Sequence, residues 1–164
     1  MVTHFTGSVF ASNAPAVAHQ VNCKGIMGGG VALQVRQRYP SVFTTYKAAC
    51  KKMQPADLLG TIQPCLCGGV QERWIINCFA QDGFGTDKQY TDYEALEKCL
   101  RKLRKWAIER KIEKIAFPYG IGCGLGGGDW SVVHDLLKKV FYDDRVTAEV
   151  WQLPEKKNFG GYRR

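Results

Sequence analysis

Two short glycine-rich segments constrain the fold of this chain more than any other feature. Residues 25–30 hold four glycines in six positions, and residues 120–128 hold six in nine, so these segments contain ten of the eighteen glycines. Each segment follows an apolar run and precedes a run with helical spacing. This arrangement points main-chain N–H groups and the positive end of a helix dipole at a bound anion. Glycines also form ordinary tight turns, but two such segments at equivalent places favour a ligand with two anionic or sugar-phosphate parts.

Hydrophobic spacing predicts an alternation of strands and helices along the chain. Strands that alternate with helices predict an α/β fold, a three-layer α/β/α sandwich around a central mixed sheet. Ligands of such sheets bind outside the carboxyl ends of the strands, where both glycine segments fall. Three helix starts are predicted from capping residues, at Ser41, at Thr91 with Glu94, and at Asp129. The predicted strands are 3–10, 16–22, 58–67 (towards an edge because of Pro64), 73–80, 114–119 and 146–153, and the predicted helices begin near 30, 41, 91 and 129.

The length and the hydropathy pattern favour a single globular domain. We expect one domain over residues 1–153 and a polar, basic tail over residues 154–164 that is mobile. No apolar run approaches the roughly 18 residues that a membrane helix needs, and the first residues lack the pattern of a signal peptide. We therefore expect a cytoplasmic protein, monomeric and without a membrane partner.

The net charge of +8 raises the question of a nucleic-acid partner. Residues 98–114 alone hold eight Lys or Arg against two Glu. These cations are spread over a helix without the aromatic interleaving of a single-strand platform, so a solvated helix face is the favoured interpretation. Attraction to polyanionic partners remains the alternative.

The seven cysteines do not form a recognisable disulfide or metal pattern. Their number is odd, and the sequence has neither a Cys-x-x-Cys motif nor a Cys/His cluster with zinc spacing. We expect reduced thiols, no metal and no cofactor. Cys123 in the second glycine segment is a candidate nucleophile if nearby N–H donors lower its pKa; a small residue in a tight loop is the favoured alternative.

Several motifs in fixed order resemble the macro domain, the ADP-ribose-binding α/β/α module. They are Gly7-Ser8-Val9, then His19 to Asn22, then Gly28-Gly29-Gly30-Val31-Ala32 at the family spacing, and Ile115 to Pro118 followed by Gly122 to Gly126. The resemblance covers about residues 3–153.

The resemblance implies how each part of ADP-ribose is bound. Val9 and Phe10 would line the adenine pocket, the amides of residues 122–125 would hold the pyrophosphate, and Asn22 would lie beside the distal ribose. Asn22 would both donate to and accept from sugar hydroxyls. The implied ADP-ribose-binding residues are Ser8, Val9, Phe10, Asn22, Cys23, Lys24, Gly25, Met27, Gly28, Gly29, Gly30, Val31, Gln81, Tyr119, Ile121, Gly122, Cys123, Gly124, Leu125 and Gly126.

Within the family, the segment from His19 to Ala32 is similar to the subgroup that hydrolyses ADP-ribose 1''-phosphate. That similarity implies His19 as catalytic base or nucleophile and Asn22 as the residue that orients the ribose; a satisfied core histidine is the alternative. Another subgroup removes ADP-ribose from glutamate or DNA with a lysine near the position of Gln81. Ser8 replaces an aspartate that contacts adenine, which implies weaker adenine discrimination.

The function that this resemblance implies is enzymatic. It is removal of a group from the 1'' position of ADP-ribose, by a phosphatase or by a de-ADP-ribosylating hydrolase. The implied substrates are ADP-ribose derivatives, with ADP-ribosylated protein or nucleic acid as a further class. The alternative is a non-catalytic module that binds or sequesters ADP-ribose or a related nucleotide.

Overall fold

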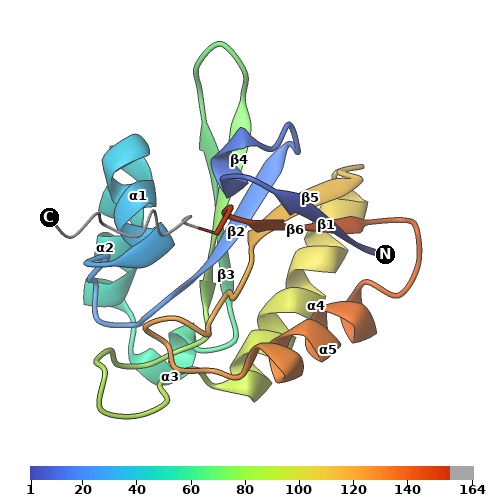
Figure 1. Ribbon diagram of the computed structural model, residues 1–164. Helices are drawn as coiled ribbons and strands as arrows, with labels where there is room; N and C mark the ends of the chain where they lie inside the picture. The colour runs from blue at the N-terminus through green and yellow to red at the C-terminus, as the bar shows by residue number, and fades with distance from the viewer. Residues whose placement is uncertain (156–164) are drawn as a thin grey trace, which may run out of the picture.

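A computed structural model describes residues 1–155 of the protein and shows a central sheet between two helical layers (Figure 1). The sheet order is β1-β6-β5-β2-β4-β3. All neighbouring strands are parallel except β3, which pairs with β4 in the antiparallel sense at one edge. The elements in chain order are β1 (Val2–Thr6), the 3-10 turn η1 (Val9–Ala11), β2 (Ala16–Val21), α1 (Gly30–Arg38), α2 (Pro40–Lys52), α3 (Pro55–Leu58), β3 (Ile62–Cys67), β4 (Arg73–Phe79), α4 (Tyr93–Glu109), β5 (Lys114–Pro118), α5 (Trp130–Val140) and β6 (Thr147–Gln152).

The predicted mixed sheet in a three-layer α/β/α fold is therefore confirmed, and two apolar clusters separate its layers. On one face of the sheet, Leu96 and Leu100 of α4 and Leu137 of α5 pack in a fully buried cluster. On the other face, Val35 of α1 and Tyr46 of α2 pack against the opposite side of the same strands. Figure 1 shows α1 and α2 on one side of the sheet and α4 and α5 on the other.

Strand β2 is the centre of the sheet and the element that positions the site. It lies between β5 and β4, and five of its six residues are buried. Alternation of side chains along a strand sends His19 to the face that α1 and α2 cover, and Gln20 to the face that α4 and α5 cover. One strand thus supplies polar side chains to both helical layers at its carboxyl end.

Four local predictions are wrong, two of them because proline favours the first turn of a helix. Val9 and Phe10 form the turn η1 instead of continuing the first strand. Leu58 ends the short helix α3, since Pro55 suits a first helical turn. Helix α2 begins at Pro40 for the same reason, with Tyr39 rather than Ser41 at the cap position.

The fourth is the start of α4. Asp92, not Thr91, caps this helix by accepting from the Ala95 N–H at 3.0 Å. Of the predicted tail, residues 156–164 lie outside the described residues. No helix among residues 1–155 combines the length and apolarity that crossing a membrane requires.

Candidate functional site

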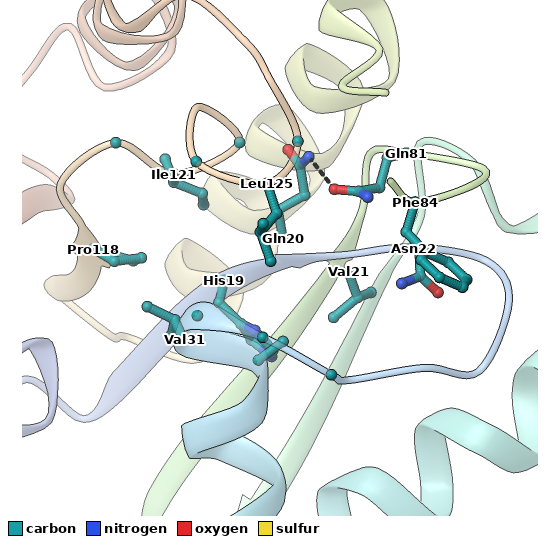
Figure 2. A pocket seen from close by; sticks show the side chains of 18 of the residues that line it. His19, Gln20, Val21, Asn22, Val31, Gln81, Phe84, Pro118, Ile121 and Leu125 are labelled. Atoms are coloured by element: carbon teal, nitrogen blue, oxygen red, sulfur yellow. Dashed lines mark hydrogen bonds between the residues drawn. The ribbon is translucent and has the colours of Figure 1, made fainter. Parts of the chain in front are cut away.

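A cavity of about 520 Å³ lies at the carboxyl end of β2, between the two glycine segments (Figure 2). We call residues 22–30 the first bend and residues 119–128 the second bend. The side chains of His19, Gln20 and Asn22 line the cavity from β2 and the first bend. Phe84 lines it from the loop after β4 (Figure 2).

The two bends approach each other closely above the cavity. A Cβ atom built on Gly29 would lie 2.5 Å from Cδ1 of Leu125, a distance that real Cβ contacts do not show. A larger residue at position 29 would push aside the exposed end of the Leu125 side chain, which lies against the first bend. The predicted meeting of two bends from separate strands is present in the structure.

Main-chain N–H groups on both bends are free to bind an anion. Within residues 1–155, the amides of Gly122, Gly124, Leu125 and Gly126 donate to no protein acceptor, and neither do those of residues 28–32 at the start of α1. Other amides of the second bend are engaged; Gly128, for example, donates to the Gly122 carbonyl at 2.9 Å. Unpaired N–H groups in a glycine-rich bend and at the N-terminus of a helix can donate to the oxygens of a phosphate.

A side-chain network braces the second bend from below. Gln20 Nε2 donates to Gln81 Oε1 at 2.8 Å, the bond drawn in Figure 2, and to Thr91 Oγ1 at 2.8 Å. Thr91 Oγ1 in turn donates to the Gly122 carbonyl at 2.6 Å, and Gln81 Nε2 donates to the Gly83 carbonyl at 2.9 Å. This network fixes the amide orientation of Gln20 and leaves its buried Oε1 without a partner among the described residues.

A chain of hydrogen bonds fixes the tautomer of His19. Gln63 Nε2 donates to the Thr45 carbonyl at 3.3 Å, and Asn77 Nδ2 donates to Gln63 Oε1 at 2.9 Å. Asn77 Oδ1 must then accept from His19 Nε2, at 2.6 Å. Because a carbonyl can only accept, every donor in the chain has one direction. The second nitrogen of His19, Nδ1, is left as a buried acceptor without a partner in residues 1–155.

Burial keeps this imidazole neutral. His19 is 1% exposed, and desolvation lowers its pKa to about 4, against the opposing effect of the Asn77 hydrogen bond. A neutral ring with its proton on Nε2 presents a lone pair at Nδ1, which can accept a proton or a hydrogen bond.

Asn22 contributes less to a ligand than the sequence predicts. Its Oδ1 already accepts from Tyr46 Oη at 2.6 Å and from the Lys24 N–H at 2.9 Å, and its Nδ2 donates to the Ile26 carbonyl at 2.8 Å. One N–H of the amide remains for a ligand, and the acceptor role expected of Asn22 is taken up by the protein itself. Asn22 and the buried Tyr46 therefore hold the first bend in shape.

A second cavity of about 300 Å³ adjoins the first. Its walls include the predicted adenine-binding residues Ser8, Val9 and Phe10, and it shares Val31 and Tyr119 with the larger cavity. Ser8 caps η1, with its Oγ accepting from the Phe10 N–H at 3.3 Å. The two cavities therefore share walls, at Val31 of α1 and at Pro118 and Tyr119 after β5.

The structure does not place all predicted ligand residues along these cavities. Cys23 and Met27 are buried in the core beneath the first bend, and Lys24 pairs with Asp82 at 3.0 Å. The remaining residues of this group are Gly25 and Cys123. All other predicted residues line one cavity or the other.

The less favoured interpretation of Cys123, a reactive thiol in the second bend, is not supported. Burial, reinforced by Asp129, raises the pKa of Cys123 to about 11, so the thiol is protonated at neutral pH. Its Sγ instead donates to the Ile121 carbonyl at 3.4 Å. Among residues 1–155 no group of three or more His, Cys, Asp or Glu side chains could hold a metal ion.

Sequence reasoning missed several residues of the site. Gln20 is the most important, and its signal was a polar amide in a strand of small apolar residues. Phe84 is 49% exposed, and an apolar ring in a polar, glycine-broken loop was a signal for a contact surface. Trp151 at the second cavity gave no local signal, because its role depends on where β6 lies in the sheet.

Comparisons with known proteins agree with this geometry. A family model described as Macro domain matches residues 18–137. A DNA ADP-ribosyl glycohydrolase of Mycobacterium tuberculosis is 32% identical over 145 residues, covering 86% of this chain and 39% of the relative. The chain thus spans about two-fifths of the length of that relative.

Two further proteins match over most of their length. An ADP-ribose 1''-phosphate phosphatase of Scheffersomyces stipitis is 32% identical over 146 residues, which cover 78% of this chain and 84% of the yeast protein. The solved macrodomain of Mycobacterium tuberculosis DarG superposes with a TM-score of 0.79 at 29% identity, over 92% of this chain and 97% of the other.

Proposed function

Because this chain belongs to the Macro domain family, we propose that it binds ADP-ribose derivatives and hydrolytically removes the group attached at the 1'' position. The observation that carries the proposal is the set of unpaired N–H groups on both bends, whose residues line one cavity. The pyrophosphate lies between these donors. The adenosine occupies the second cavity, near Phe10, and the distal ribose lies by Asn22 and Phe84.

His19 is the residue of this site that can move a proton. Its Nδ1 accepts a proton from a water molecule as the hydroxide adds to the reacting centre at the 1'' position. The bond to the departing group breaks, and the proton passes from Nδ1 to that group, so the products are ADP-ribose and the protonated leaving group. The anionic ligand favours the imidazolium that forms, which offsets part of the desolvation that disfavours it.

The names of the two relatives describe two such hydrolyses. One relative is named for ADP-ribosyl groups on DNA and the other for ADP-ribose 1''-phosphate. Both substrates carry phosphate groups beyond those of ADP-ribose itself, and free amides suit an anionic ligand of either kind. Developing charge in the transition state is stabilised by the same donors.

A non-catalytic reader is the second candidate, and two observations favour it. The Gln81 side chain is held by Gln20 and by the Gly83 carbonyl, so it braces the site and has no basic group. His19 is also nearly inaccessible to solvent. A protein that binds ADP-ribose through backbone amides needs neither residue as a catalyst.

Two measurements test the proposal. Calorimetric titration with ADP-ribose should show saturable binding, and a panel of 1''-linked substrates followed by mass spectrometry should show release of ADP-ribose from at least one. The panel contains ADP-ribose 1''-phosphate, the O-acetyl ester, and ADP-ribosylated protein, DNA and RNA.

The results separate the two candidates. Absence of ADP-ribose binding would refute the site itself, whereas binding without turnover of any substrate would establish the reader. His19→Gln preserves a donor towards Asn77 but removes the basic nitrogen, so it should retain ADP-ribose binding and lose turnover. Unchanged turnover in this variant would remove His19 from the mechanism.

A further inference from the structure

The positive charge of the described chain comes entirely from its first third. Residues 1–56 contain no Asp or Glu and six cationic side chains, a net charge of +6, whereas residues 57–155 have thirteen cationic against fifteen acidic side chains, a net charge of −2. Five of the six cations lie on α1 and α2, at Arg36, Arg38, Lys47, Lys51 and Lys52, and all five are exposed. We call this set the α1–α2 surface.

Among residues 1–155 the cations of the α1–α2 surface have no acidic partners, in contrast to four of the five cations of α4. On α4, Lys98 pairs with Glu94 and Arg101 pairs with Glu97, each at a spacing of four residues. In residues 1–155 no carboxylate oxygen lies within 4.0 Å of any cation of the α1–α2 surface. Lys47 and Lys51 are themselves a like-charge pair at i,i+4, a spacing that destabilises a helix in the absence of an anionic partner.

Aromatic rings hold part of this surface in place. The Arg36 guanidinium lies 4.2 Å from the centroid of the Phe43 ring, and Lys47 Nζ approaches the same ring at 5.8 Å. The Arg38 guanidinium lies 4.6 Å from the centroid of Phe10. Cation–π contact favours these positions without neutralising the charge, so the guanidinium N–H groups stay available to phosphate oxygens.

The α1–α2 surface is continuous with the walls of the site. Lys47 lies near Gly25 of the first bend, which itself lines neither cavity: a Cβ built on Gly25 would lie 3.7 Å from Cγ of Lys47. Phe10, beneath Arg38, lines the second cavity. Val31 of α1 lines both cavities. A polyanion on this surface would therefore lie next to the mouth of the ADP-ribose site.

We infer that the α1–α2 surface binds the phosphate backbone of a nucleic acid whose ADP-ribosylated group occupies the cavity. This inference rests on the proposed function and names its substrate class. Cations without acidic partners in the protein lie next to a site for a phosphorylated ligand. Such a surface is suited to a nucleic acid, which carries one negative charge per nucleotide. The α4 face has the longest run of basic residues in the sequence, but four of its five cations (Lys98, Arg101, Arg104 and Lys105) pair with acidic side chains, so it serves as the internal control.

Two matched triple variants test the inference. Lys47→Gln/Lys51→Gln/Lys52→Gln removes three charges from α2, and Lys98→Gln/Lys102→Gln/Lys105→Gln removes three from α4, so both proteins have the same net charge. All six lysines are exposed on helices, and glutamine at position 47 keeps the Cγ that lies near Gly25. Fluorescence anisotropy measures the binding of an unmodified single-stranded DNA oligonucleotide as a function of salt.

The α2 variant should bind the oligonucleotide at least about tenfold more weakly than the wild type, and its log K against log salt slope should fall by about 2. The α4 variant should lose less than about threefold. For ADP-ribosylated oligonucleotide, kcat/KM should fall in the α2 variant alone. Calorimetric affinity for ADP-ribose should stay within about twofold in both variants, because neither changes the cavity.

Three results would overturn the inference. Equal losses in the two variants would show unspecific attraction by net charge, and an unchanged α2 variant would show that the surface binds no nucleic acid. Competition by poly-glutamate as strong as that by DNA, at equal charge, would assign the surface to acidic proteins. Each of these results can occur while the wild type binds ADP-ribose. A wild type that does not bind ADP-ribose would instead refute the proposed function, and would leave the binding of nucleic acid by the surface to be judged from the oligonucleotide measurements.

Discussion

The buried His19 predicts a specific pH dependence of stability. Its pKa is about 4 in the folded protein and 6.5 in a model peptide. Below the unfolded value the unfolded chain takes up a proton that the folded protein does not, so the free energy of unfolding falls as the pH drops from 6.5 towards 4. Above pH 6.5 His19 is neutral in both states, and its effect no longer lowers the free energy of unfolding. Between about pH 7.5 and about pH 4.5 the loss amounts to roughly 2.5 kcal/mol.

Urea unfolding at a series of pH values measures this loss. The best background is His4→Gln/His134→Gln, in which His19 is the only histidine left. The comparison is with the same protein carrying His19→Gln in addition, where the glutamine amide can still donate to Asn77. Carboxylates titrate alike in both proteins, so the difference between the two pH profiles isolates His19.

The difference between the free energies of unfolding of the two proteins should change by about 2.5 kcal/mol between about pH 7.5 and about pH 4.5, as the protein with His19 loses stability towards low pH. Parallel profiles would mean that His19 is protonated as readily in the folded protein as in the unfolded one. In that case Nδ1 would have an acceptor or solvent beside it, and the account of His19 as a neutral, unpartnered base would be wrong.

Three substitutions test the bends. Gly124→Glu should weaken ADP-ribose binding by about a hundredfold or more, because a carboxylate near the diphosphate costs up to about 4 kcal/mol; Gly124→Gln is the neutral control, and a Cβ there meets nothing within 4 Å. Equal affinities of the two variants in calorimetry would contradict the placement of the pyrophosphate. Gly126→Ala should lower the free energy of unfolding by about 1–3 kcal/mol, since its Cβ would lie 2.4 Å from a threonine hydroxyl and 2.7 Å from a carbonyl oxygen. Gly68→Ala should not lower it, because a Cβ there meets nothing within 4 Å. Equal thermal stability of the Gly126→Ala and Gly68→Ala variants would contradict the close packing around Gly126. Tyr46→Phe should cost about 1–3 kcal/mol in urea unfolding and also weaken ADP-ribose binding, because the first bend loses the bond to Asn22; full affinity would show that this brace is dispensable.

Much of the fold follows from local pattern. The apolar runs and helical spacing predict the mixed α/β/α sandwich. The two glycine segments predict that bends at the ends of β2 and β5 meet. These features depend on periodicity and on backbone conformation, which a single sequence carries. Pro64 likewise marks β3 as an edge strand, because it cannot donate within a ladder.

The parts that were missed depend on neighbours distant in sequence. Thr91 has the spacing of a helix cap, but its hydroxyl donates to the Gly122 carbonyl, thirty-one residues away. The oxygen of Asn22 is taken by Tyr46, twenty-four residues away. The α1–α2 surface cannot be recognised from the sequence alone. The longest basic run lies on α4, and only the folded structure shows that most cations of α4 have acidic partners whereas those of the α1–α2 surface have none within residues 1–155.

The central position of β2 has a consequence for dynamics. Ala16 and Val17 pair with β4 on one side and β5 on the other, so this half of the strand should exchange its amides with deuterium most slowly, whereas His19 and Gln20 pair with β4 alone. The chemistry is thus placed directly after the doubly paired part of β2, at the point where the sheet opens towards the ligand.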